Sequence, residues 1–334
     1  MLQGKPFFSI RADISGCRYE VRINDVPVIS DDNGYPVTVN FPVNEYIANG
    51  ENELSVYLMP LVEDIYEETT TELTKECKGF VALQVRQSGT PDRENQEISR
   101  IQFNGPNDNP AMLAGTTPES KLDSTAGFKV DAGGDVSVAQ VKSMVWDFKN
   151  EVVPELNYPK YLNWPQRNRI PIEKGAVISQ TVSLKSGLPD WAWLQSEQFV
   201  ENESVRTELY QEYLSLQAQL LSDKLSEDAL YPHFSERTKE LALAYYVTEK
   251  SMLPDGILKC ALDKKIYEIY RIEQPIEKEK ESFFLAVQGN GRLAAILNWD
   301  GSHRLIFNEV AEDGGSTTFP ITFRKENGKW IITR

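Results

Sequence analysis

Histidine and cysteine are scarce in this chain of 334 residues, which contains only two histidines, His233 and His303, and three cysteines, Cys17, Cys77 and Cys260. A zinc site usually draws on several His or Cys ligands close in space, and the odd, widely spaced cysteines do not form a disulfide-rich framework. We therefore predict no metal and no cofactor, although a calcium or magnesium site built from Asp and Glu alone stays open. The cysteines are interpreted as buried free thiols, with a pair between Cys17 and Cys77 as the alternative.

Long apolar runs are also missing, and none approaches the ~20 residues needed to cross a bilayer. Lys and Arg number 35 against 50 Asp and Glu, which gives a formal net charge of -15. Nucleic-acid binding depends on Lys and Arg that neutralise phosphates, and anionic membrane surfaces attract basic segments. We therefore expect neither a nucleic-acid partner nor a membrane span.

The first residues, Met1 to Lys5, have neither the basic start nor the apolar core of a secretory signal. The sequence as written therefore indicates a cytoplasmic protein. A periplasmic or secreted protein whose signal has been removed fits equally well, so the compartment stays open.

What the sequence does contain is typical of a folded chain of about two domains, with 40% hydrophobic and 10% aromatic residues. Up to about residue 190, apolar residues alternate with polar ones in short runs separated by turns, for example over residues 19–23, 37–41, 54–58 and 176–184. This pattern predicts an antiparallel β-sandwich in residues 1–190.

Residues 21–28 and 43–56 resemble the jelly-roll modules related to galactose-binding domains, in which a turn containing Asn and a later G-x-N-x-L segment lead into strands. Gly50 permits a positive φ, and Asn52 can bond to its own backbone before the next strand begins. The resemblance covers about the first 60 residues. It implies a jelly-roll-like sandwich and transfers no sugar site.

The apolar period changes from two to about 3.6 near residue 196. A helix is predicted over 203–222 with Asn202 as its N-cap, and a second over 235–249, preceded by Pro232. The helix face consists of Val205, Leu209, Tyr213, Leu216 and Leu220.

Strand patterns then return, with hairpins at Gly289–Arg292 and Asn327–Gly328. The fold class is therefore predicted to be mainly β with α+β: a sandwich, followed in residues 196–334 by a helix pair packed on a curved antiparallel sheet. This order of elements and the closing segment 323–332 resemble the nuclear-transport-factor-like, or SnoaL-like, superfamily. The resemblance implies a conical pocket, and members include both enzymes and non-catalytic binding domains.

No catalytic residue is predicted. The sequence has no G-x-S-x-G elbow and no phosphate-binding glycine motif before a helix. Asp300 and His303 fall in a segment that we interpret as a turn between strands. His233 and Glu236 could form a general-base unit if they faced a pocket, but a polar entrance to a helix is favoured.

Two further groups are candidates for binding. Trp191 and Trp193 are two residues apart, so in a strand their rings would share one side and could stack on a sugar or a partner. Sealing the junction between the domains is the favoured alternative. The other group is an acidic segment that could dock a basic partner, or could simply be a solvated loop; it contains Glu63, Asp64, Glu67 and Glu68.

The weak catalytic signals and the acidity favour a non-catalytic binding or interaction protein of bacterial type, such as an inhibitor or immunity-type protein with a basic partner. Two alternatives stay open. One is a carbohydrate-binding protein that uses Trp191 and Trp193 or loops of the sandwich to hold a glycan. The other is a small-molecule enzyme with a pocket inside the C-terminal cone, and this idea requires that the cone is not filled by side chains.

Overall fold

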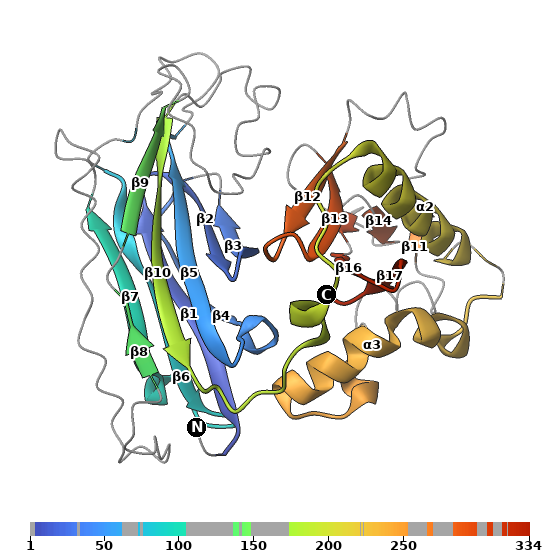
Figure 1. The fold of residues 1–334 in the computed structure, drawn as a ribbon, viewed down its shortest axis with the longest axis horizontal. Helices are drawn as coiled ribbons and strands as arrows, with labels where there is room; N and C mark the ends of the chain where they lie inside the picture. The colour runs from blue at the N-terminus through green and yellow to red at the C-terminus, as the bar shows by residue number, and fades with distance from the viewer. Residues whose placement is uncertain are drawn as a thin grey trace. The chain divides into compact units, whose positions relative to one another are not determined.

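The computed structural model describes residues 4–31, 34–61, 73, 76–104, 136–139, 142–147, 174–220, 222, 224–252, 266–269, 283–298, 306–309, 316–318 and 320–334. The chain divides into two compact units, Met1–Trp191 (unit 1) and Ala192–Arg334 (unit 2). The domains predicted from the apolar period were 1–190 and 196–334. Within the described residues the protein is mainly β, with the two helices α2 and α3 in unit 2 (Figure 1), as the predicted fold class requires.

Unit 1 contains two antiparallel sheets. The first has the order β4–β1–β6–β7, from β1 (Pro6–Ser15), β4 (Val37–Pro42), β6 (Lys78–Gln87) and β7 (Gln96–Asn104). The second has the order β3–β2–β5–β10–β8, with β9 also paired to β10, from β2 (Arg18–Ile23), β3 (Val26–Asp31), β5 (Gly50–Met59), β8 (Val136–Val138), β9 (Lys142–Asp147) and β10 (Lys174–Leu184). Alternate residues of these strands form the core, among them Phe8, Ile10, Val21, Val56 and Ile178, each with no exposed area.

The turn that carries the jelly-roll-like signature has the predicted local chemistry. Gly50 has φ +112°, a value that side chains other than glycine rarely adopt. The Asn52 side chain accepts a hydrogen bond from the Ala48 N–H (2.8 Å) and donates to the Ala48 (3.1 Å) and Gly50 (3.2 Å) carbonyls. The amide of Asn52 therefore organises the segment between the short helical turn η1 (Asn44–Tyr46) and β5.

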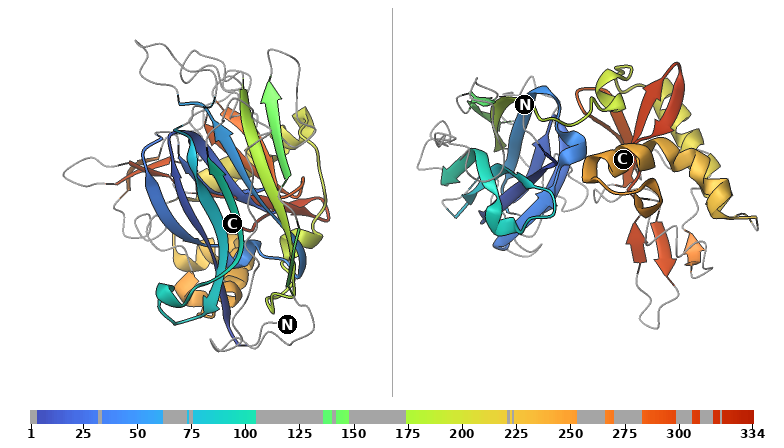
Figure 2. Two further views of the ribbon diagram at one scale, coloured as in Figure 1. Left: turned by 90° about the vertical axis from the view of Figure 1, so that its left-hand side faces the viewer. Right: turned by 90° about the horizontal axis from the view of Figure 1, so that it is seen from below.

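Unit 2 begins with η5 (Ala192–Gln195) and the two helices α2 (Glu203–Leu220) and α3 (Glu227–Tyr245). One sheet has the order β12–β13–β16–β17, from β12 (Phe283–Gln288), β13 (Leu293–Asn298), β16 (Phe323–Glu326) and β17 (Lys329–Ile332). A second joins β11 (Ile266–Ile269), β14 (Ile306–Glu309) and β15 (Ser316–Thr318). Figures 1 and 2 show α2 beside the strands of the first sheet, and α3 contacts β17.

Helix α2 confirms the predicted face, because every residue of that face is buried. The Asn202 side chain caps it by accepting a hydrogen bond from the Val205 N–H at 3.0 Å. The predicted start of the second helix was wrong: α3 begins at Glu227, and Pro232 lies inside it. Ser226 caps α3 by accepting from the Ala229 N–H, so the helix begins upstream of Pro232.

Candidate functional site

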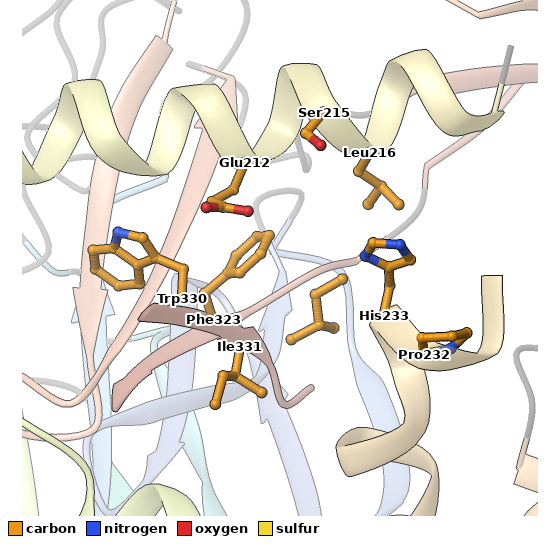
Figure 3. A pocket seen from close by; sticks show the side chains of 9 residues that line it. Glu212, Ser215, Leu216, Pro232, His233, Phe323, Trp330 and Ile331 are labelled. Atoms are coloured by element: carbon orange, nitrogen blue, oxygen red, sulfur yellow. The ribbon is translucent and has the colours of Figure 1, made fainter. Parts of the chain in front are cut away.

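A hollow of about 180 Å³ lies in unit 2 between the two helices and the β16–β17 hairpin. Its lining is shown in Figure 3 and comprises Glu212, Ser215, Leu216, Pro232, His233, Phe323, Trp330, Ile331 and Ile332. Helix α2 supplies the first three, the first turns of α3 supply Pro232 and His233, and the hairpin supplies the rest. The hollow is open to solvent along its rim, where Glu212, Ser215 and His233 are exposed.

The floor of the hollow is apolar because it is the edge of the unit 2 core. Leu216, Phe323 and Ile332 are buried and belong to one hydrophobic cluster that also contains Leu209 and Tyr213. The hairpin that carries Phe323 and Ile332 closes through Asn327 (φ +51°) and Gly328 (φ +74°), the left-handed pair that a two-residue type I′ turn requires.

Apart from this hollow, buried side chains fill the space beneath α2. Leu209 and Tyr213 have no exposed area. The Tyr213 hydroxyl donates to the Ile321 carbonyl at 3.1 Å and accepts from the Ile296 N–H at 3.1 Å, so this side chain ties the helix to β13 and to the segment that leads into β16. The hollow is therefore a shallow remainder beside a packed core. Filling of the cone by Leu209, Tyr213, Phe284 and Trp299 would exclude an enzyme pocket inside it; Phe284 belongs to β12, and Trp299 lies outside the described residues.

Charge is concentrated at the two ends of the hollow. In Figure 3, Glu212 and Trp330 lie at one end, His233, Pro232 and Leu216 lie at the other, and the Phe323 ring lies between them. Partial burial raises the pKa of Glu212 above its ordinary value, and the nearby imidazole of His233 opposes this with a smaller effect. Within the described residues Glu212 has no hydrogen bond and no ion pair, so its carboxylate faces the hollow without a partner.

Trp330 is held in place by three neighbours. Its Nε1–H donates to Glu208 Oε2 at 3.3 Å, the Lys325 Nζ lies 5.2 Å from the ring centroid, and the Phe199 ring meets it edge-on at 5.2 Å. Glu208 also accepts from Lys325 at 2.6 Å, and this hydrogen bond lowers the pKa of Glu208. The aromatic wall beside Glu212 is therefore rigidly positioned before any ligand arrives.

The structure does not place His233 and Glu236, which the sequence analysis considered as a general-base unit, in the same site. His233 lines the hollow, but Glu236 does not: it pairs with Lys239 at 3.1 Å and lies 3.9 Å from Arg324. The carboxylate that shares the hollow with His233 is Glu212, from the other helix. The sequence signal for Glu212 is its position four residues before Leu216, at the border of the apolar face of α2.

The two tryptophans do not form an exposed platform. Each has 1% of its surface exposed, and they do not share one side of a strand, because residues 192–195 form the 3-10 helix η5. The Trp191 Nε1–H donates to the Ile47 carbonyl at 2.9 Å within unit 1. The Trp193 ring lies so close to Gly289, within unit 2, that a Cβ there would be 3.1 Å from it. The interpretation with stacked, exposed rings, which was the less favoured of the two, was therefore wrong.

The remaining predicted site residues, Glu63, Asp64, Glu67, Glu68 and His303, lie outside the described residues. In the part of the chain that is described, no group of three or more His, Cys, Asp or Glu side chains could hold a metal ion. None of the described helices is long and apolar enough to cross a membrane.

No family model, curated protein or solved structure matches this chain. The two resemblances read from the sequence therefore stay predictions.

A second charged cluster is buried in unit 1. The Arg22 guanidinium bonds to Glu20 at 2.6 Å and to Asp25 at 2.5 Å, and it lies 5.0 Å from the centroid of the Tyr57 ring. Arg22 and Glu20 are each 2% exposed, and burial raises the pKa of Glu20 against the opposing effect of Arg22. The cluster is compact and internally paired, so we treat it as structural.

Proposed function

We propose that this chain is a non-catalytic binding protein whose unit 2 takes a basic side chain of a protein partner into the hollow beneath Glu212. The observation that carries the proposal is the unpartnered, partly buried carboxylate of Glu212 beside a fixed indole and an apolar floor. An inhibitor or immunity-type protein is one protein of this kind.

The chemistry of the lining supports a lysine or arginine. These side chains bury their methylene stems against apolar surface while the charged end stays near solvent or a carboxylate. Phe323 and Leu216 offer the apolar surface, Trp330 offers an aromatic face that attracts cations, and Glu212 offers the opposite charge. A cation would also relieve the cost of keeping the Glu212 carboxylate partly out of water.

The size of the hollow and the charge of the whole chain also favour a single basic side chain as the ligand. Small-molecule sites usually measure about 300–1,000 Å³, whereas this hollow measures about 180 Å³, which suits one side chain better than a whole metabolite. The net charge of -15 favours encounter with a basic partner and disfavours an acidic one.

The proposal can be tested on an array of short peptides that differ only at a central position, which is Lys, Arg, Gln, Glu or norleucine. We expect the full chain to prefer Lys and Arg, and Glu212→Gln to weaken that binding by about five- to tenfold. Glu51→Gln is the matched control, because Glu51 is exposed on β5 of unit 1 and the same charge is removed far from the hollow in sequence. Equal binding of all five peptides, or equal losses in the two variants, would overturn the proposal.

A small-molecule enzyme is a second candidate, favoured by one observation: a carboxylate with a raised pKa shares a hollow with an imidazole. The two groups lie at opposite ends of the hollow in Figure 3, whereas a base and the group that orients it usually share a hydrogen bond. Hydrolysis of p-nitrophenyl acetate that both Glu212→Gln and His233→Asn abolish would support the enzyme over the binding protein.

A further inference from the structure

The two cysteines of unit 1 occupy neighbouring positions at one end of the sandwich. Cys17 lies in the turn between β1 and β2, and Cys77 directly precedes β6. Strands β1 and β6 pair antiparallel as far as Ser15 opposite Lys78. The next residues along the two chains, Gly16 and Cys77, are therefore brought together by the register itself.

Gly16 marks how closely the two segments approach. A Cβ at this position would lie 2.1 Å from the Glu76 carbonyl oxygen and 2.9 Å from the Cys77 nitrogen, and the residue has φ +73°. Only glycine fits such a contact. The close approach fixes the backbone of Cys17 against the segment that carries Cys77.

Both thiols point toward the interior between the two sheets. In a strand, residues an even number of positions apart lie on the same side of the sheet. Cys17 therefore lies on the side of the buried β2 residues Tyr19 and Val21, and Cys77 lies on the side of the buried β6 residues Val81 and Leu83. Neither cysteine has any exposed area, and both are free thiols in this structure. The Cys17 thiol donates to the Ser15 carbonyl at 3.7 Å, and the neighbouring Cys77 side chain is the largest cause of the raised pKa of Cys17.

We propose that Cys17 and Cys77 are an oxidisable pair that forms a disulfide across the interior of the sandwich, linking the second sheet at the start of β2 to the first sheet at the start of β6. The oxidant is a small-molecule disulfide. One protein thiolate attacks it and releases one small thiol, and the other protein thiolate then displaces the second. Two electrons pass to the small disulfide, and one S–S bond forms in the protein as one breaks in the oxidant.

The burial of the pair determines when this reaction takes place. The neighbouring Cys77 side chain and burial both raise the pKa of Cys17, and the thiolate is the species that reacts. The folded protein is therefore slow to oxidise, and exchange proceeds while the chain folds, before the sheets close over the thiols.

The test is to refold the full chain in a mixture of oxidised and reduced glutathione, and in parallel with a reducing agent alone. We expect the oxidised sample to lose two hydrogen masses, to yield a Cys17–Cys77 linked peptide on non-reducing digestion, and to unfold at a temperature higher by about 10 °C. The native protein given the same mixture should react much more slowly.

Variants keep the result interpretable. Cys17→Ala and Cys77→Ala should each abolish the link and the thermal shift, whereas Cys260→Ala, the matched control, should leave both unchanged. The inference is overturned if Cys17 and Cys77 both remain open to alkylation in denaturant after oxidative refolding, or if the link that forms includes Cys260.

Discussion

At the scale of single residues, the carboxylates of Glu20 and Glu212 differ in their burial and in their partners. Glu20 is buried and paired with Arg22, whereas Glu212 is partly exposed and has no partner within the described residues. A carboxylate without a hydrogen bond or ion pair, whose pKa burial raises against a smaller effect of His233, is a candidate for binding a ligand, while a buried pair is held by its own geometry. This contrast is the reason that Glu212, and not the larger cluster around Arg22, carries the functional proposal.

Arg22→Met should destabilise unit 1 by about 3–5 kcal/mol, because it leaves the buried charge of Glu20 uncompensated. The double variant Glu20→Leu/Arg22→Met removes two of the three charges of the cluster and should recover part of that loss, because the Asp25 carboxylate, 10% exposed, stays without its Arg22 partner. Urea unfolding followed by fluorescence measures both. Arg11→Met is the control, since Arg11 is exposed on β1, and its effect should stay within about 0.5 kcal/mol. Equal losses in the single and double variants would show that Arg22 acts by packing alone.

Glu212→Gln should make the protein more stable at neutral pH and leave it unchanged in acid. The folded pKa of Glu212 is raised, so its protonation stabilises the folded state; that contribution is fully present below the ordinary carboxyl pKa and is lost as the pH rises through the folded value. Because the group is partly exposed, we expect a gain below about 1 kcal/mol. Urea midpoints at about pH 4 and about pH 7 measure it, and a variant less stable than wild type at neutral pH would contradict this account.

At the scale of elements, the helix caps are the clearest local determinants of unit 2. Asn202 caps α2 and Ser226 caps α3. Asn202→Ala and Ser226→Ala should each cost about 1 kcal/mol of unfolding free energy. Gln211→Ala, on the exposed side of α2, should be nearly neutral. If Ser226→Ala costs nothing, the position of the α3 start is wrong.

These elements also show which parts of the fold local sequence determines. The spacing of Val205, Leu209 and Tyr213 predicted α2 because one apolar face is enough to define a helix. The Asn327–Gly328 turn was predicted because it needs only two residues with positive φ. The start of α3 was misplaced because Pro232 was taken as a boundary, although the cap at Ser226 lies upstream of it.

The candidate site was predicted only in part, because its residues come from segments that are far apart in the sequence. His233 and Glu236 were paired because they are three residues apart, but the hollow joins α2, α3 and the last hairpin. Which carboxylate faces His233 depends on how two helices pack, and apolar periodicity does not contain that information. The less favoured interpretation of Trp191 and Trp193, an exposed platform, failed because it assumed the spacing of a strand, whereas residues 192–195 form a 3-10 helix.

At the scale of the whole molecule, each unit has its own core, and the charge of -15 belongs to the chain as a whole. A general acidic surface would attract any basic molecule, and salt would weaken that attraction. Binding through the hollow is different, because it also requires the stem of the side chain to lie against Phe323 and Trp330. In the function that we propose, the charge would increase the rate of encounter, and the hollow would determine which residue is accepted.

The most direct test is a titration of the ¹⁵N-labelled full chain with acetyl-Gly-Lys-Gly-amide, compared with the same peptide carrying norleucine, which keeps the stem and lacks the charge. The account predicts shifts at the Trp330 indole and at the Glu212 and His233 amides with the lysine peptide, much smaller shifts with norleucine, and their loss in Glu212→Gln. Shifts confined to unit 1, or equal responses to the two peptides, would contradict it.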